Sequence, residues 1–187
     1  MNRTAIALLM LLAANATAAA DFNACVKELR RDAQAQGVTA QTFEAGMAGV
    51  EPEPTVIEAM DNQPESKTPV WDYLAVLADA QRIADGRAKL AEWSARLGDA
   101  EGKFGVDRHT VVAVWGVESD YGKTTGGRPL VRSLATVSCF GGRQRYFRGE
   151  LYATLRILQS GDVRPEALTG SWAGAFGQTQ FMPSTFL

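Results

Sequence analysis

The sequence predicts a mainly α-helical fold, and three observations support this prediction. Apolar residues recur with helical spacing in several segments, as in the series Phe22, Val26, Leu29 and Ala33. Residues that commonly cap helices stand at the ends of such segments. No segment shows the alternation of apolar and polar residues that would indicate a half-buried strand with confidence.

The first third of the mature chain is expected to hold short helices. A helix is expected over residues 21–37, with a glycine as its C-cap, and a second begins at Thr39 or Thr42 and ends at Met47. Prolines limit residues 49–69 to short helical pieces joined by turns.

Longer helices follow. Helical spacing covers residues 71–92 and continues to about Gly105, with a break expected near Leu97-Gly98. A further helix is expected over residues 145–159, and Gly161 ends it.

Residues 1–20 are predicted to be a secretory signal peptide. A basic start is followed by an apolar run from Ala5 to Ala14 and by small residues up to Ala20, after which cleavage is expected. The run is too short for a stable transmembrane helix, and Cys25 lies too far beyond it to be a lipidation site. We therefore expect a mature chain without a membrane anchor, exported to the periplasm.

Composition narrows the function of the mature chain, residues 21–187. Removal of Arg3 leaves 18 basic against 21 acidic residues, a net charge of −3, which argues against nucleic acid as a partner. The length of the mature chain suits one domain.

Cys25 and Cys139 are the only cysteines and can form one disulfide in an oxidising compartment, the alternative being two free buried thiols. With a single histidine, His109, no metal site is predicted, and no spacing indicates a cofactor.

Glu118 is the candidate catalytic residue. It falls near the end of a helix that Asp107 caps, on the same face as Val111, Val114 and Trp115. A carboxyl group that faces inward among apolar side chains is desolvated and favours the protonated form, which suits a general acid. The alternative is a helix-end acid that reaches water or an arginine.

Residues 170–185 form a second unusual segment, in which glycines and polar residues alternate with aromatic side chains. Glycines allow close backbone approach, aromatic rings cover the apolar faces of sugars, and polar groups bind their hydroxyls. The segment predicts a sugar-binding cleft, although tight helix packing is an alternative use of small residues.

These motifs resemble those of the periplasmic B-type lytic murein transglycosylases, which have a lysozyme-like α-helical catalytic core. Residues 114–122 resemble the family's catalytic-glutamate motif, and residues 170–177 with 180–184 resemble its substrate-cleft motif. Weaker similarities lie at residues 62–65, 71–73 and 143–147. Together the similarities follow the family order and span the mature chain, which is therefore expected to be a catalytic domain.

The resemblance implies a role for individual residues. Glu118 would be the sole catalytic acid and base, and the cleft would be lined by Tyr73, Arg143, Ser171 and Gln180. Many relatives carry adjacent arginines where this chain has Arg143 and Arg145 separated by one residue, so either can contact the substrate. Relatives continue with further core helices beyond the cleft motif, so the lysozyme-like domain is expected to be incomplete at its C-terminal end.

The implied activity is cleavage of the β-1,4 bond between N-acetylmuramic acid and N-acetylglucosamine, with formation of a 1,6-anhydromuramoyl end. The expected partner is therefore a peptidoglycan glycan strand, and contact with cell-wall synthesis proteins is left open. Two alternatives remain: a non-catalytic peptidoglycan-binding or scaffold protein, and a hydrolysing lysozyme. Glycosidases that hydrolyse usually need a second carboxylate, and Asp120, two residues after Glu118, points away from it on a helix.

Overall fold

The structure is a computed structural model that describes residues 21–63 and 67–187. The expected signal peptide, residues 1–20, and part of the weak motif at residues 62–65 lie outside the described residues. Within the described ranges, no helix combines the length and the apolar character needed to span a membrane.

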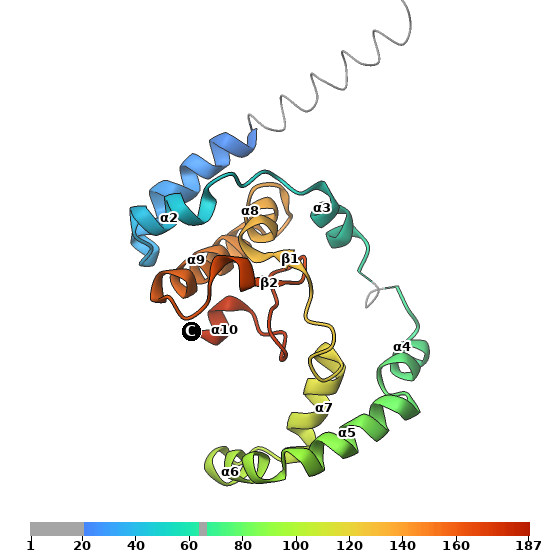
Figure 1. Ribbon diagram of the computed structural model, residues 1–187. Helices are drawn as coiled ribbons and strands as arrows, with labels where there is room; N and C mark the ends of the chain where they lie inside the picture. Colours follow the sequence, from blue (N-terminus) through green and yellow to red (C-terminus); the bar gives the residue numbers. More distant parts are fainter. Residues whose placement is uncertain (1–20, 64–66) are drawn as a thin grey trace, which may run out of the picture.

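The helices form two groups, which we call the α8–α9 lobe and the α5–α7 lobe (Figure 1). In the first, α8 and α9 pack against each other and against the shorter helices around them: residues 21–33, α2 (Ala40–Met47), α3 (Pro54–Asp61), α8 (Leu130–Phe140) and α9 (Gln144–Ser160). The second consists of α5 (Ala80–Glu92), α6 (Ser94–Phe104) and α7 (Arg108–Ser119), and α4 (Val70–Leu77) precedes it.

Local signals set several of the helix ends in the α8–α9 lobe as predicted. Residues 21–33 continue into the 3₁₀ helix η1 (Gln34–Gln36), and Gly37 ends it with φ 80°. The side chain of Thr39 accepts a hydrogen bond from the backbone N–H of Thr42, so it caps α2. Gly161, with φ 79°, ends α9. The core between these helices is fully buried and includes Leu29, Phe43, Leu134, Leu151 and Leu155.

Helix α8 is the longest element that the sequence analysis missed. Seven of its residues are buried, and they include Ser133, Thr136 and Ser138 as well as apolar side chains. Its apolar residues do recur with helical spacing, but no side chain caps its start after Pro129 and Gly141 at its end does not adopt the left-handed conformation, so the local signals that mark other helices are absent.

The helix breaks in the α5–α7 lobe differ from the prediction. The expected break near Leu97-Gly98 is wrong, since α6 runs through both residues to Phe104. The chain instead breaks before α5, where the side chain of Asp79 accepts hydrogen bonds from two backbone N–H groups, and again at Trp93. An N-cap fixes a helix start, whereas a single glycine is tolerated within a helix.

Aromatic side chains hold this lobe together. The rings of Trp93 and Trp115 meet edge to face at 6.1 Å, and those of Trp115 and Tyr121 at 5.7 Å. The hydroxyl of Tyr121 donates a hydrogen bond of 2.8 Å to the carbonyl of Arg82 on α5. Burial raises the pKa of this phenol. The segment that follows Glu118 is thereby fixed to α5.

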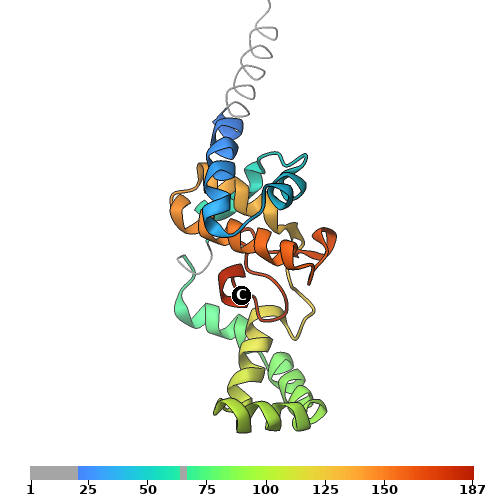
Figure 2. The same cartoon turned by 90° about the vertical axis from the view of Figure 1, so that its left-hand side faces the viewer.

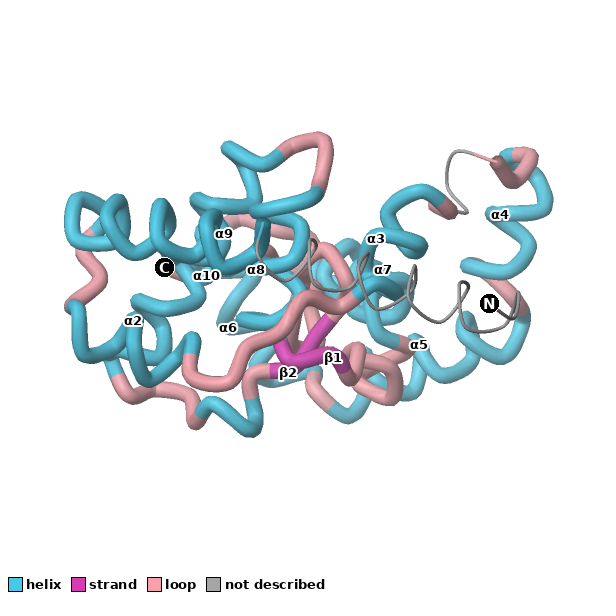
Figure 3. Tube along the Cα trace, turned by 90° about the horizontal axis from the view of Figure 1, so that it is seen from above, coloured by secondary structure: helices cyan, strands magenta, loops and turns pink. Residues whose placement is uncertain are grey.

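A short antiparallel ladder lies beside the start of α8, where β1 (Arg128–Pro129) pairs with β2 (Thr169–Gly170) (Figure 3). The 3₁₀ helix η3 (Pro165–Ala167) lies just before β2, and α10 (Pro183–Phe186) packs against α9 between the lobes (Figure 2). Two-residue strands are too short to show an alternating pattern, so the sequence did not predict them.

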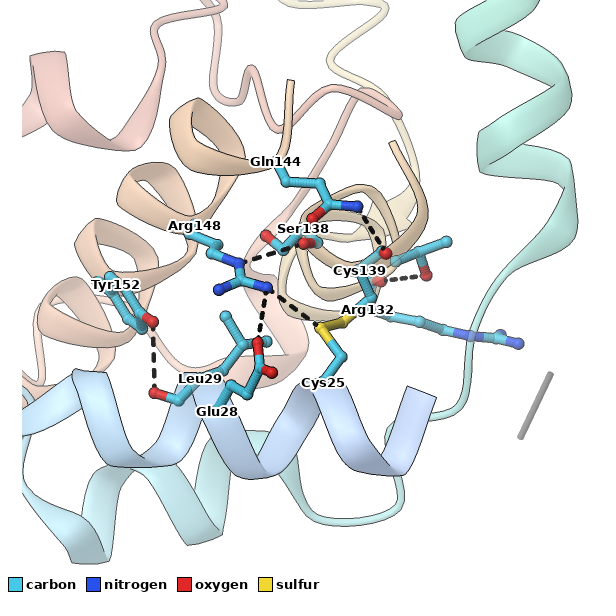
Figure 4. The surroundings of a disulfide bond; sticks show 10 residues. Cys25, Glu28, Leu29, Arg132, Ser138, Cys139, Gln144, Arg148 and Tyr152 are labelled. Carbon is cyan, nitrogen blue, oxygen red and sulfur yellow. Dashed lines mark hydrogen bonds and ion pairs between the residues drawn. A yellow bond between two sulfur atoms is a disulfide. The ribbon is translucent and has the colours of Figure 1, made fainter. Parts of the chain in front are cut away.

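The predicted disulfide is present between Cys25 and Cys139, and it ties residues 21–33 to the end of α8 (Figure 4). Arg148 of α9 lies beside it. The Arg148 guanidinium donates to the carbonyl of Ser138 at 3.4 Å and pairs with Glu28 at 3.3 Å. Three helices are therefore cross-connected at this point.

Acidification is expected to weaken the α5–α7 lobe. Hydrogen bonds from the backbone N–H groups of Arg82 and Thr110 hold the pKa values of Asp79 and Asp107 below the ordinary 3.8. Hydrogen bonds from the side chains of Lys123, Lys89 and Arg108 likewise lower the pKa values of Asp85, Glu92 and Glu101.

Because these pKa values are lower in the folded protein, the unfolded chain binds more protons as the pH falls below about 4.5. The free energy of unfolding is therefore highest above that pH and falls as the pH drops through the folded pKa values. Hydrogen-exchange protection factors in α5, α6 and α7 should be lower at pH 3 than at pH 6. Equal protection at both values would show that these pairs contribute nothing.

Candidate functional site

Glu118 lies in the last turn of α7, directly before a backbone reversal. The helix begins as predicted, with the side chain of Asp107 accepting a hydrogen bond from the N–H of Thr110. After the helix, Asp120, Tyr121 and Gly122 all have positive φ, at 48°, 58° and 89°. Two successive non-glycine residues in this region are unusual, and such strain is concentrated at functional sites.

The prediction that Glu118 faces inward is wrong. Glu118 is exposed, and so are Val111 (38% exposed) and Val114 (42%) on the same face. The buried face of α7 instead contains Val112, Gly116 and Ser119, and it packs against α5 and α6. Because α7 is apolar on both faces, helical spacing cannot decide which one is covered. The Glu118 carboxylate is therefore open to solvent and to a ligand.

Ser119, the next residue, connects α7 to the cleft motif. It is buried, and its hydroxyl donates a hydrogen bond of 2.6 Å to the carbonyl of Gln178. The same oxygen accepts a hydrogen bond of 3.0 Å from the N–H of Gly122. Ser119 thus fixes both the reversal after Glu118 and the distance to residues 170–181. The sequence analysis did not identify it, although a hydroxyl among the apolar residues of α7 was the available signal.

The cleft motif folds as a compact turn held by its own backbone. Isolated bridges join Phe176 to Gly170 and to Phe181. The hydroxyl of Ser171 accepts a hydrogen bond from the N–H of Ala175 at 3.0 Å, so its proton stays available to a ligand. The Gln180 amide nitrogen donates to the carbonyls of Thr125 and Gly177, at 3.0 and 2.8 Å. Since both amide protons have partners, Gln180 offers a ligand only its carbonyl oxygen.

Gly126 and Gly170 let the loop after α7 lie directly against the cleft motif. Gly126 has φ 80°, and a Cβ atom placed on it would overlap the carbonyl of Gly170. Gly126→Ala should therefore lower the free energy of unfolding by about 2–3 kcal/mol, through backbone strain and this overlap. Gly127→Ala is the matched control, because a Cβ there meets no atom within 4 Å. Urea unfolding measures both, and equal midpoints would disprove the close contact.

The two candidate arginines occupy different settings near the start of α9. The guanidinium of Arg143 lies over the ring of Tyr146 at 4.5 Å and within 6.0 Å of that of Phe147. Arg145 is exposed and has no hydrogen-bond or ion-pair partner among residues 21–63 and 67–187. Tyr73 is half-buried and belongs to α4, which lies in a different part of the fold from α9 (Figure 1).

A second carboxylate near this region was not predicted. Glu150 on α9 is only 4% exposed, and it accepts hydrogen bonds from the N–H and hydroxyl of Ser184, at 2.9 and 2.7 Å. It thereby positions α10, whose first turn overlaps the end of the cleft motif. An acid beside Leu151 on the buried face of α9 was the signal that the sequence carried.

Glu150 and Ser184 line an open hollow together with Arg143 and Tyr146. Among the described residues, no group of His, Cys, Asp and Glu side chains is arranged to hold a metal ion. The described residues of the site offer the Glu118 carboxyl group for proton transfer and hydrogen-bonding groups on Ser171 and Gln180.

Comparisons with known proteins agree on one family. The family model described as a transglycosylase SLT domain matches residues 21–187. The chain is 30% identical over 142 residues to membrane-bound lytic murein transglycosylase B of Escherichia coli (strain K12). The aligned region covers 71% of this chain and 39% of that protein.

Solved structures show the same likeness. SltB3 from Pseudomonas aeruginosa, in complex with NAG-NAM-pentapeptide, is 45% identical with a TM-score of 0.82, over 88% of this chain and 44% of that one. The Escherichia coli lytic transglycosylase Slt35, in complex with bulgecin A, is 27% identical with a TM-score of 0.77, and the match covers 87% of this chain and 52% of Slt35. The chain thus spans about two fifths to one half of the length of these relatives.

Proposed function

The chain belongs to the transglycosylase SLT domain family, among the B-type lytic transglycosylases with their lysozyme-like helical fold, and on that premise we propose that it is a peptidoglycan lytic transglycosylase. The bond cleaved is the β-1,4 bond between N-acetylmuramic acid and N-acetylglucosamine. Residues 21–187 form the catalytic domain in this proposal, and the product carries a 1,6-anhydromuramoyl end.

The observation that carries the proposal is the position of Glu118. Its carboxyl group is exposed at the end of α7, and the adjacent Ser119 fixes that end to the cleft motif. Glu118 donates a proton to the glycosidic oxygen as the bond to C1 breaks. The resulting carboxylate then accepts the proton of the muramoyl C6 hydroxyl, whose oxygen bonds to C1. One residue performs both proton transfers, and no water enters the product.

This reaction removes the need for a second carboxylate, which hydrolysing glycosidases place about 5–9.5 Å from the acid. Asp120 is ill suited to that role, because its carboxylate pairs with Lys123 at 3.3 Å and its backbone is in the left-handed region. The geometry therefore favours the transglycosylase over the lysozyme.

The substrate contacts we propose come from both lobes. Ser171 can donate to a sugar oxygen and Gln180 can accept from a sugar hydroxyl, which follows from their hydrogen bonds within the protein. Arg143 presents a guanidinium held over aromatic rings, and Tyr73 and Arg145 complete the proposed set.

The proposed location is the periplasm, after cleavage of the signal peptide at Ala20. The support is the composition of residues 1–20 and the disulfide, which is stable in an oxidising compartment. A periplasmic enzyme of this kind meets peptidoglycan directly.

Release of soluble fragments tests whether the protein is an enzyme or a binding module. Purified insoluble peptidoglycan is incubated with the chain, and the supernatant is assayed for muropeptides while the pellet is assayed for bound protein. The proposal expects soluble muropeptides. Binding to the pellet with no soluble product would instead establish a peptidoglycan-binding or scaffold protein.

A further inference from the structure

An apolar hollow lies between α5 and α7, and none of its lining residues belongs to the cleft motif. We call it the α5–α7 hollow. Its volume is about 220 Å³. An engineered cavity of about 150 Å³ binds benzene, and sites for drug-sized ligands begin at about 300 Å³. Apart from Tyr121, Arg82, Arg87 and His109, every lining residue is aliphatic or glycine. The hollow therefore has the size and the surface for one short hydrocarbon chain.

The wall of the α5–α7 hollow is fixed, whereas its mouth is open. The Tyr121 hydroxyl donates to the carbonyl of Arg82, and a Cβ atom on Gly86 would meet that hydroxyl at 2.6 Å, so glycine leaves the room that Tyr121 occupies. Two aliphatic side chains of the lining remain open to water, Ile83 at 45% and Val117 at 43% exposed. A ligand that covers them removes apolar surface from water, which favours binding.

The charged groups of the α5–α7 hollow are all basic. Its lining includes Arg82, Arg87 and His109 and, among the residues that the structure describes, no Asp or Glu. The charge of His109 is offset by Asp107, which lies 3.3 Å away. Arg82 donates from Nη1 to a backbone carbonyl, and its Nε–H has no partner. Arg87 is exposed and has no hydrogen-bond or ion-pair partner in the described chain. Two guanidinium groups beside an apolar lining favour a ligand with an anionic head.

We propose that the α5–α7 hollow binds a fatty carboxylate, with its hydrocarbon chain among the aliphatic side chains and its carboxylate beside Arg82 and Arg87. The inference is independent of the proposed function, because it uses neither the Glu118 carboxyl group nor the cleft motif. Val117 and Tyr121, on either side of Glu118 in the sequence, both line the hollow. A bound chain therefore contacts the end of α7 and stabilises its packing against α5.

A series of small amphiphiles tests the chemical class of the ligand. Octanoate is titrated into the full chain by calorimetry, at concentrations below those at which it aggregates. Hexanoate, which is two methylene groups shorter, should bind about tenfold more weakly. Octylamine has the same chain with a positive head and should also bind at least about tenfold more weakly than octanoate. Absence of octanoate binding, or equal binding of octanoate and octylamine, would overturn the inference.

Filling the hollow tests where octanoate binds. Ala113 lines the hollow from an exposed position of α7, so Ala113→Leu occupies space there without disturbing the core. We expect this variant to lose octanoate binding. Ala91→Leu is the matched control, since it adds the same side chain at an exposed position of α5 outside the hollow and should bind normally. If Ala113→Leu binds octanoate as the unmodified chain does, the ligand lies elsewhere and the inference is wrong.

A second pair of variants tests the role of the guanidinium group. Arg87→Gln should weaken octanoate binding by about threefold and leave octylamine binding no weaker. Arg156→Gln removes the same charge from an exposed position of α9 and should bind octanoate as the unmodified chain does. Equal affinity of Arg87→Gln and Arg156→Gln for octanoate would contradict the proposed position of the carboxylate. Thermal unfolding checks that each variant is folded, and none of these results depends on cleavage of a glycosidic bond.

Discussion

Substitution of Glu118 by glutamine is expected to lower the release of anhydromuropeptides by about 10³-fold or more. The amide has nearly the shape of the carboxyl group, but it cannot donate the first proton or accept the second. Since the side chain is exposed and has no hydrogen-bond partner among the described residues, the substitution should leave folding unchanged. Product release is measured by chromatography of the soluble fraction, and thermal unfolding checks the fold.

Asp120→Asn is the matched control for this prediction. It also removes a carboxylate at the end of α7, and asparagine tolerates the left-handed backbone conformation that Asp120 adopts with φ 48°. We expect it to retain most of the activity. If Asp120→Asn were as inactive as Glu118→Gln, two carboxylates would be required and the single-residue mechanism would be wrong.

Loss of the disulfide should have the largest effect on stability. It joins residues 114 positions apart, and closing a loop of that length stabilises by about 4–5 kcal/mol in the chain-entropy model. Cys25→Ser combined with Cys139→Ser should lower the free energy of urea unfolding by that amount.

Reductant provides the control for the disulfide prediction. It should destabilise the unmodified chain to the level of the double variant and should leave the double variant unchanged. A loss below about 1 kcal/mol would show that the packing of Leu29 and Phe43 alone holds residues 21–33 in place.

Local signals accounted for several of the helix ends. Thr39 and Asp107 cap helices with their own side chains, and Gly37 and Gly161 adopt the left-handed conformation that ends them, so nearby residues suffice to predict these points. Helix α8 could not be predicted in this way, because no side chain caps its start and Gly141 at its end is not in the left-handed conformation.

The candidate site, too, could be predicted from the sequence only in part. The motif around Glu118 is continuous in sequence and could be recognised, but the face that it occupies depends on where α5 packs. Ser119 and Glu150 act through hydrogen bonds to Gln178 and Ser184, 59 and 34 positions away. Such contacts have no periodic signal, so only the fold reveals them.

The structure places the two candidate arginines in different surroundings, which their spacing in the sequence does not show. Arg143 is stacked over Tyr146, whereas Arg145 has no hydrogen-bond or ion-pair partner in the described chain. One residue of spacing turns the two side chains to different parts of the α9 surface, which predicts separate roles for them.

The origin of the oxygen in the product tests the central claim most directly. Peptidoglycan is digested by the chain in water enriched in ¹⁸O, and the masses of the soluble muropeptides are measured by mass spectrometry. If Glu118 directs attack by the muramoyl C6 hydroxyl, the products are lighter by one water than hydrolytic muropeptides and contain no ¹⁸O. Incorporation of one ¹⁸O at the muramoyl C1 would show that water is the nucleophile, and the protein would then be a hydrolase.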